Sequence, residues 1–560
     1  MTDAAKAIQA TRRAQASAAD PIASVWVAAN AGTGKTHVLT TRILRLLLQG
    51  TSPERILALT YTKAAAAEMA RRTFDTLSRW VTSSDEELAK ALRELLDRAP
   101  TVDEARRARE LFARAIETPG GLKVQTIHAF CERLLKRFPL EAGVSPHFSI
   151  LDDALAAEMR REAVDATLTR AARDEQSQLG QALKTAIVYA VDDQFDAVLA
   201  DALRARDWLD TVARLGLMEP GTRNDAFAAA DAAYRKTLGL KADDSLASVH
   251  ADMARVVDDA TMQRASAVLA EGGKTDQQLG DALTRARKAS SVAERVAALE
   301  NAFLTAEGEP RSDTRFITKK IREKEPGLTA ELVMARDRLA KLGARQTALR
   351  LHEATMALVT LASAVAETFH SAKLARAALD FDDLIEKVGR LIGRPGTDTH
   401  ASAAEWVLYK LDGGIDHILV DEAQDTSRPQ WAVVEGLAQA FYESGGARAD
   451  DVRTLFAVGD EKQSIYGFQG AAPKMFAEMA QLFERQAGSV ERPFRRVPLT
   501  LSFRTVSPVL QLVDRVFAEP DRTPGLTAAG SAIRHDAYRA GQAGLVELWP
   551  LEPYTAAEES

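Results

Sequence analysis

A glycine-rich stretch with a lysine and a threonine lies near the amino terminus. It consists of Ala29, Asn30, Ala31, Gly32, Thr33, Gly34, Lys35 and Thr36. The two glycines let backbone N–H groups turn toward phosphate oxygens, and a helix that follows would add its positive amino-terminal end. Lys35 would then reach the β- and γ-phosphates of a nucleotide, and Thr36 would ligate Mg²⁺. The stretch predicts a phosphate-binding loop, although Ala29 stands where the first glycine is usual; the alternative is a simple turn before a helix.

A second stretch places two carboxylates directly after an apolar run, in the order Ile-Leu-Val-Asp-Glu-Ala-Gln-Asp from Ile418 to Asp425. Asp421 could hold Mg²⁺, and Glu422 could polarise an attacking water molecule. The alternative is a solvated acidic turn. Because a phosphate-binding loop precedes it in the same chain, we interpret the stretch as a Walker B site.

The surrounding residues predict the elements that must hold these groups. Residues 24–28 and 56–60 read as buried strands, with an apolar helix at 38–48 between them. This strand–helix–strand order is typical of a parallel sheet. Strand patterns return at 417–420 and 454–458, each followed by acidic residues at the strand end, where α/β sheets place their ligands.

Residues 152–378 have a different texture, rich in alanine and charged residues and poor in proline and glycine. Leu351, Leu358 and Val365 recur every seven residues, which predicts an amphipathic helix. We expect an all-helical insertion, because the spacing does not persist long enough for the alternative, a long coiled coil.

Bulk composition limits the class of protein more than its function. The chain has 560 residues, 46% of them hydrophobic and 27% charged, and a net charge of −7. This length predicts several domains, and the net charge argues only weakly against nucleic acid, because large motors hold DNA in local grooves. A single cysteine, Cys131, no apolar segment of membrane-spanning length and no signal-peptide core together predict a cytoplasmic location.

Several further motifs, taken in order along the chain, resemble those of UvrD/Rep-type superfamily 1 DNA helicases. More narrowly, the chain is similar to AddA-type helicase–nuclease subunits of double-strand break repair. The motifs that carry the resemblance are Ile56–Met69 (motif Ia), Thr126–Cys131 (Thr-x-His-x-Phe), Leu379–Leu384, Asp421–Thr426 (motif II), Val458–Ala471 (motif III) and Leu501–Thr505 (motif IV).

The resemblance implies roles for individual positions around ATP. Gln15 would read the adenine edge, and Phe503 would stack on adenine where the family often has tyrosine. Gln463 would sense the γ-phosphate and link it to DNA, and Arg504 would stabilise the charge of the transition state. The alternatives are a surface glutamine at position 15 and an ordinary salt-bridge donor at position 504.

The resemblance also implies a path for single-stranded DNA lined by aromatic and polar side chains. The candidate DNA contacts are Tyr61, Thr62, Thr126, His128, Phe130, Tyr466 and Phe468. A core position is an equal alternative for Phe130. For Asp380–Leu384 we expect helix capping and packing rather than a site.

The motifs divide the chain into an expected domain order. Residues 1–150 and 379–490 would form a RecA-like domain 1A, residues 151–378 a helical domain 1B, and residues 491–560 the start of a second RecA-like domain 2A. Later family motifs and a nuclease carboxylate cluster are missing from the sequence. We therefore expect an amino-terminal fragment that binds ATP weakly and unwinds DNA poorly by itself.

The motifs favour one function over its alternatives. The favoured one is an ATP- and Mg²⁺-dependent translocase or helicase on single- and double-stranded DNA in homologous recombination, partnered by an AddB-type nuclease subunit. A plain UvrD/Rep-like repair helicase is its near alternative. A P-loop ATPase without motor function lacks a use for Gln463–Tyr466, and a non-catalytic DNA-binding subunit would not need intact Lys35, Glu422 and Arg504.

Overall fold

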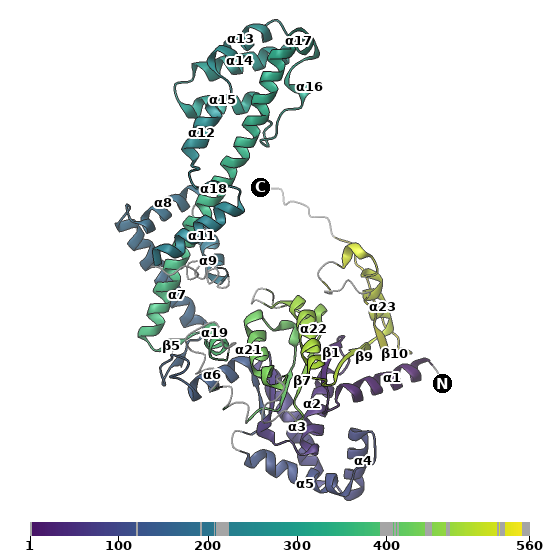
Figure 1. Ribbon diagram of the computed structural model, residues 1–560. Helices are drawn as coiled ribbons and strands as arrows, with labels where there is room; N and C mark the ends of the chain where they lie inside the picture. The colour runs from purple at the N-terminus through teal and green to yellow at the C-terminus, as the bar shows by residue number, and fades with distance from the viewer. Residues whose placement is uncertain are drawn as a thin grey trace, which may run out of the picture. The chain divides into compact units, whose positions relative to one another are not determined.

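The computed structural model describes residues 3–118, 121–190, 193–205, 208, 223–392, 407, 410, 414–442, 451–465, 467, 471–523, 526 and 533–551. The chain divides into two compact units, one formed by Met1–Leu151 with Ala377–Ser560 and the other by Asp152–Arg376. Figure 1 shows the elements of both. Each unit has its own hydrophobic core.

A six-stranded parallel sheet is the centre of the first unit, with the strand order β3-β2-β6-β7-β1-β8. Its strands are β1 (Ser24–Ala29), β2 (Ile56–Thr60), β3 (Lys123–Thr126), β6 (His417–Val420), β7 (Thr454–Gly459) and β8 (Phe494–Leu499). The central strands β2, β6 and β7 are buried along their whole length, as expected for a parallel sheet covered on both faces. The α/β fold and the four strands predicted from the sequence are confirmed.

Helices cover both faces of this sheet. One core contains residues of α2 (Lys35–Gln49), α3 (Lys63–Thr82), α4 (Asp85–Leu96) and α5 (Val102–Glu117). The other contains residues of α6 (Ile127–Arg137), α19 (Phe381–Leu391), α21 (Arg428–Ala438) and α22 (Pro473–Ser489). Helix α1 (Asp3–Ala18) packs against β8. The 3₁₀ helices are η1 (Pro53–Arg55), η2 (Ala423–Asp425), η3 (Gln439–Phe441), η4 (Glu461–Gln463) and η6 (Pro520–Arg522).

A buried arginine ties α2 to the strands on either side of it. The Arg42 guanidinium is fully buried and donates to the carbonyl oxygens of Ala18, Asp20 and Ala23 at 3.1, 2.6 and 2.6 Å. It also donates to the Thr454 hydroxyl at 2.9 Å. Burial lowers the pKa of Arg42 to about 9, so the side chain remains charged at neutral pH. Its bonds fix the start of β1 and of β7, the two strands that lead into the predicted site.

The capping expected before motif II is confirmed. The Asp380 side chain accepts from the Asp383 N–H at 2.9 Å, and the Asp383 carboxylate accepts from the Asp380 N–H at 3.0 Å. This capping box starts α19, and Leu384 is buried in the core beside it. Just before α19, β5 (Ala378–Leu379) pairs in parallel with β4 (Ser149–Ile150), so the two ends of the chain that flank the second unit lie side by side.

The residues after Leu499 form a small second sheet in the same unit. Strand β9 (Leu501–Val506) pairs in parallel with β10 (Asp536–Arg539), and α23 (Ser507–Val516) packs on both. Strand β8 was expected to open the second domain, but it pairs with β1 as the edge of the first sheet.

The strand expected at Leu545–Trp549 is wrong. These residues form no strand, and Leu545, Leu548 and Trp549 are 76%, 97% and 80% exposed. An apolar run forms a strand only when a neighbouring strand and a core receive it, and none of the described elements does so here.

The second unit is helical throughout its described residues. The longest helix is α18 (Pro326–Ala375), and the other helices pack along it (Figure 1). They are α7 (Asp153–Arg173), α8 (Gln178–Tyr189), α9 (Asp193–Arg204), α11 (Arg223–Thr237), α12 (Leu246–Ala254), α13 (Asp259–Leu269), α14 (Lys274–Lys288), α15 (Val292–Phe303), α16 (Asp313–Phe316) and α17 (Lys319–Lys324). The predicted helix around Leu358 and Val365 is confirmed, but Leu351 is exposed, because the buried face of α18 passes through Leu349 and His352 instead.

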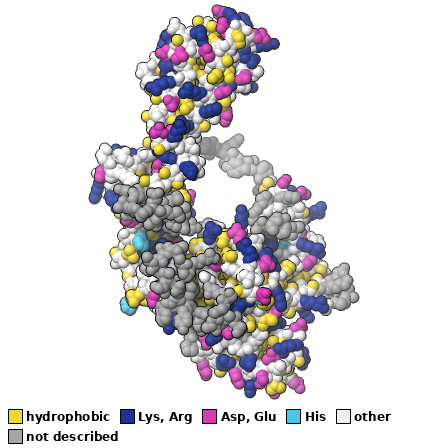
Figure 2. Space-filling view, in the orientation of Figure 1, with side chains coloured by type: hydrophobic (Ala, Val, Ile, Leu, Met, Phe, Trp, Pro, Cys, Tyr) yellow, Lys and Arg dark blue, Asp and Glu magenta, His cyan; other side chains and the backbone are white. Residues whose placement is uncertain are grey.

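The surface mixes both signs of charge. On the face shown in Figure 2, basic and acidic side chains alternate over both units. Within the described parts of the chain, no helix combines the length and the apolar character needed to cross a bilayer.

Candidate nucleotide site

The predicted phosphate-binding loop connects β1 to α2. Gly32 and Gly34 have φ angles of +72° and +88°, in the left-handed region that glycine adopts without strain. Gly34 is the N-cap of α2, and no side chain among the described residues caps it. The first N–H groups of α2, which includes Lys35 and Thr36, are therefore left for an anionic ligand. Ala29 is the last residue of β1, and Ala31 and the buried Thr33 lie in the turn, where the Thr33 hydroxyl donates to the Asn30 carbonyl at 2.8 Å.

Gln15 lies against this loop. Its Nε2 donates to the Thr33 carbonyl at 3.2 Å from α1. A Cβ on Gly34 would lie 3.2 Å from the same Nε2, so the loop and the Gln15 amide are in close contact. The structure thus brings Gln15 to the loop beside which its role would require it.

Two carboxylates at the end of β6 face the loop. Lys35 Nζ lies 2.9 Å from Glu422 Oε2, and the side chains are 11% and 37% exposed. Asp421 is buried, and burial together with the Glu422 charge raises its pKa to about 6. Glu422 has φ 47°, and its N–H donates to Asp421 Oδ1 at 3.0 Å. The structure brings Lys35, Asp421 and Glu422 together at the carboxyl ends of the parallel strands.

This group of residues fits a magnesium nucleotide. A buried carboxylate whose pKa is raised has lost hydration that a cation would replace. Thr36, in the first turn of α2, is the hydroxyl expected to share that cation. The uncapped helix start and Lys35 supply the positive groups that phosphates need.

A buried side-chain network joins Glu422 to the end of β7, and sequence reasoning missed it. Gln424 donates to Glu422 Oε2 at 2.9 Å and accepts from the Asp460 N–H at 2.9 Å. Asp460 Oδ2 in turn accepts from Gln463 Nε2 at 2.5 Å. The available signal was a glutamine placed between acidic residues after a buried strand, and a glycine, Gly459, immediately before Asp460.

The strand that carries Phe503 and Arg504 lies directly on the loop. The Phe503 N–H donates to the Gly32 carbonyl at 2.9 Å. A Cβ on Gly32 would lie 2.7 Å from the Arg504 Cβ, so only glycine permits this approach. The Asn30 side chain donates to the Arg534 carbonyl at 3.0 Å, and the Phe503 ring packs on Tyr538 with centroids 5.2 Å apart. Phe503 and Arg504 therefore reach the loop from β9, as the motif IV assignment requires.

The candidate DNA contacts follow β2 and β3, on the far side of β6 from the loop. Thr62 and Thr126 cap α3 and α6, accepting from the N–H groups of Ala65 and Ala129 at 3.1 and 3.2 Å. The half-buried His128 ring meets Phe381 edge-on at 5.4 Å, and burial lowers its pKa.

The remaining DNA candidates differ in what the structure shows of them. Phe130 is 6% exposed and belongs to the core between α6 and the sheet, so its packing leaves it no face for stacking on a base. Tyr61 is half-buried at the end of β2. Tyr466 and Phe468 lie outside the described residues.

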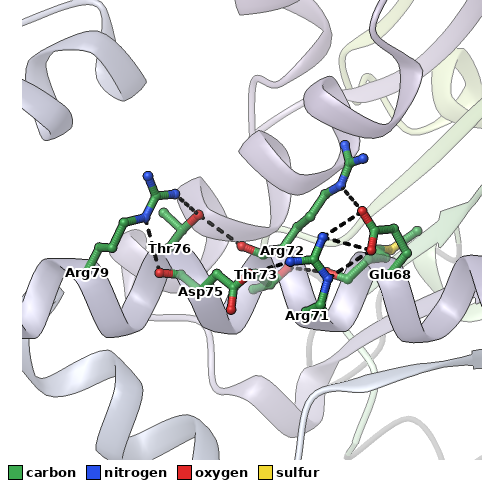
Figure 3. A network of polar contacts seen from close by, with 8 residues as sticks. Glu68, Arg71, Arg72, Thr73, Asp75, Thr76 and Arg79 are labelled. Carbon is green, nitrogen blue, oxygen red and sulfur yellow. Dashed lines mark hydrogen bonds and ion pairs between the residues drawn. The ribbon is translucent and has the colours of Figure 1, made fainter.

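Helix α3, which leads away from Tyr61 and Thr62, carries a chain of ion pairs (Figure 3). Glu68 accepts from Arg72 at 2.6 Å and from Arg71 at 2.9 Å, and Arg71 also donates to Asp75 at 2.7 Å. These bonds hold the pKa of Glu68 below its usual value. The side chains are largely exposed, so the pairs order the helix surface more than they stabilise the fold.

Known proteins support the same assignment. Residues 10–484 match the model of the UvrD/REP helicase N-terminal domain. The chain is 25% identical over 518 residues to an ATP-dependent helicase/nuclease subunit from Anoxybacillus flavithermus, and the match covers 88% of this chain and 39% of that protein. The proteins of the same description from Desulforudis audaxviator and Pelotomaculum thermopropionicum are 28% and 26% identical, over 88% of this chain and 38% and 37% of their own lengths.

The chain thus spans about two fifths of the length of these curated relatives. The family model covers most of the chain, from α1 through α22, and includes the phosphate-binding loop, the Asp421–Glu422 pair and the Gln463 turn. On this match, the chain belongs to the UvrD/REP helicase family.

Proposed function

We propose that the chain is the ATP-binding part of an ATP-dependent DNA helicase, a translocase on single-stranded DNA that acts in double-strand break repair by homologous recombination. The observation that supports this most directly is the cluster in which Lys35 contacts Glu422 at 2.9 Å while Arg504 and Phe503 approach Gly32 from β9. The relatives described as ATP-dependent helicase/nuclease subunits motivate the repair role, and they motivate an AddB-type nuclease as the partner protein.

In this proposal the loop binds the phosphates of ATP through the N–H groups at the start of α2. Lys35 moves from Glu422 to the β- and γ-phosphates, which frees the carboxylate to polarise the attacking water. Thr36 and Asp421 hold Mg²⁺, which supplies positive charge to the phosphate oxygens. Arg504 stabilises the transferred phosphoryl group, Gln463 senses it, and Gln15 and Phe503 hold the adenine.

The domain assignment follows the same reasoning. Residues 1–150 and 379–490 would be domain 1A, 151–378 domain 1B, and 491–560 the beginning of 2A, with β8 counted with 1A because it pairs with β1. Single-stranded DNA would pass over the carboxyl ends of β2 and β3, near Tyr61, Thr62, Thr126 and His128. Stacking by Tyr466 and Phe468 belongs to the proposal as well.

The test is ATP hydrolysis by the full-length protein with and without an oligonucleotide of single-stranded DNA. DNA should raise the rate, Lys35→Ala should abolish it, and Glu422→Gln should lower kcat by roughly 10²–10⁴-fold while nucleotide binding persists. Glu478→Gln, on the exposed face of α22, is the matched control and should leave the rate unchanged. Hydrolysis that DNA does not stimulate would instead support a P-loop ATPase without motor function.

A further inference from the structure

Gln424 is a buried amide whose polar groups are all engaged. It is 1% exposed, and its Nε2 donates to Glu422 Oε2 at 2.9 Å and to Asp425 Oδ2 at 3.0 Å. Its Oε1 accepts from the Asp460 N–H at 2.9 Å. Carboxylates only accept and the backbone N–H only donates, so these partners fix which end of the amide faces which side. Gln424 therefore has one orientation, set by groups that follow two strands, β6 and β7.

On the near side, Gln424 shares an oxygen with the loop lysine. Lys35 Nζ and Gln424 Nε2 both lie 2.9 Å from Glu422 Oε2. When Lys35 turns to a phosphate, the Gln424 amide is the side-chain donor that stays on that oxygen. The charge of Glu422 then acts more strongly on the amide, because the competing ammonium has left.

On the far side, the Asp460 that Gln424 holds through its N–H organises the turn carrying Gln463. Asp460 is the N-cap of η4, and its Oδ1 accepts from the Lys462 N–H at 3.3 Å. Its Oδ2 accepts from Gln463 Nε2 at 2.5 Å. A displacement of the Asp460 backbone would therefore move the Gln463 side chain.

The packing leaves little room for slack between the two sides. A Cβ on Gly459 would lie 2.7 Å from Gln424 Oε1 and 2.9 Å from the Phe476 ring. The amide thus touches the backbone of β7 directly, in a close-packed site that transmits displacements rather than absorbing them.

We propose that Gln424 is a positioning residue that links the exchange of Lys35 between Glu422 and phosphate to the Asp460–Gln463 turn. It relays the occupancy of the nucleotide site to the element expected to meet DNA. This inference rests on the proposed function, because the relay is useful only where nucleotide and DNA are coupled.

The test compares Gln424→Met, which keeps the volume and removes the hydrogen bonds, with Gln424→Asn, whose amide is too short to reach both sides. The control is Gln430→Met, a buried glutamine that caps α21 through Ser427. In the full-length protein, the ratio of DNA-stimulated to basal ATP hydrolysis should fall roughly 2- to 30-fold in both Gln424 variants. The KM for ATP should change less than kcat, and Gln430→Met should keep the wild-type ratio.

Two further measurements separate the relay from a general loss of stability. Gln463→Ala combined with Gln424→Met should lose no more stimulation than Gln463→Ala alone, since both act on one path. Hydrogen exchange at residues 459–465 should respond to a non-hydrolysable ATP analogue in the wild type and not in Gln424→Met.

A Gln424→Met or Gln424→Asn variant that retains the stimulation ratio would overturn the relay, and so would additive losses in the double variant. If Gln424→Met does not fold, Gln424→Asn decides the question by the same measurements. A wild-type protein that DNA does not stimulate would contradict the proposed function instead, and the hydrogen-exchange response would still show whether the relay exists.

Discussion

Replacement of Asp421 by asparagine should make the nucleotide-free protein more stable while removing its Mg²⁺ ligand. Asp421 is buried at the end of β6, and its pKa is raised from 3.8 to about 6 by burial and by Glu422. The folded protein thus keeps this proton up to about pH 6, whereas the unfolded chain releases it near pH 4. Stability is therefore lost as the pH rises through this window, and the loss persists at neutral pH.

The shift gives the size of the effect. At 1.36 kcal/mol per pKa unit, the ionised Asp421 costs the folded state about 3 kcal/mol at pH 8 and about half of that at pH 5. Asparagine has the same shape, and its Oδ1 can still accept from the Glu422 N–H, which donates to Asp421 Oδ1 at 3.0 Å. The variant should therefore gain close to the full amount at pH 8.

The assay is urea unfolding in the presence of a chelator at pH 8 and pH 5. Tryptophan fluorescence can follow it, because Trp26 and Trp431 stack at 5.6 Å in the core beside β6. Added Mg²⁺ and a nucleotide analogue should stabilise the wild type more than the variant. The matched control is Asp416→Asn at the opposite end of β6, which should be no more stable than wild type because Asp416 pairs with Arg55 at 3.0 Å.

Equal or lower stability of Asp421→Asn at pH 8 would refute this reasoning. A gain that is the same at pH 5 and pH 8 would refute it too, since the titration of Asp421 would then not be its source.

Three other changes have definite expectations. Arg504→Ala should lower kcat for ATP by on the order of 10³-fold in steady-state hydrolysis, and a loss below tenfold would exclude the proposed role. Gly32→Ala should cost about 1–2 kcal/mol in urea unfolding, because φ is +72° and the new Cβ meets Arg504; a neutral result would mean that the loop conformation differs. Arg42→Met should lower the unfolding free energy by about 3–5 kcal/mol, since three buried carbonyl groups lose their donor, and unchanged thermal unfolding would contradict this.

The sequence predicts the first sheet well because its signals are local. The strand before the glycine loop and the strand before Asp421 are short apolar runs, and a parallel sheet brings their carboxyl ends to one edge. The capping box at Asp380 is likewise written within four residues. Such features need no knowledge of distant partners.

The features that the sequence does not predict depend on distant partners. Gln424 meets Asp460 across 36 positions, and Gly32 meets Phe503 of β9 from the other end of the chain. The same apolar character fits a core or a binding platform, so Phe130 could be placed only by its neighbours. The Leu545–Trp549 run shows the converse error, because apolar alternation without a receiving sheet edge gives no strand.

The short β4–β5 ribbon bears on how such a chain could have evolved. The residues that leave the first unit at Leu151 and return at Ala377 are joined by the pairing of Ser149 with Ala378 and of Ile150 with Leu379. Two chain ends held side by side are the condition under which a domain can be gained, exchanged or lost without disturbing its host. The helical unit is thus a module in the genetic sense, so lineages could vary it while the ATP-binding sheet stayed constant, and an engineer could replace it with a short linker across the ribbon.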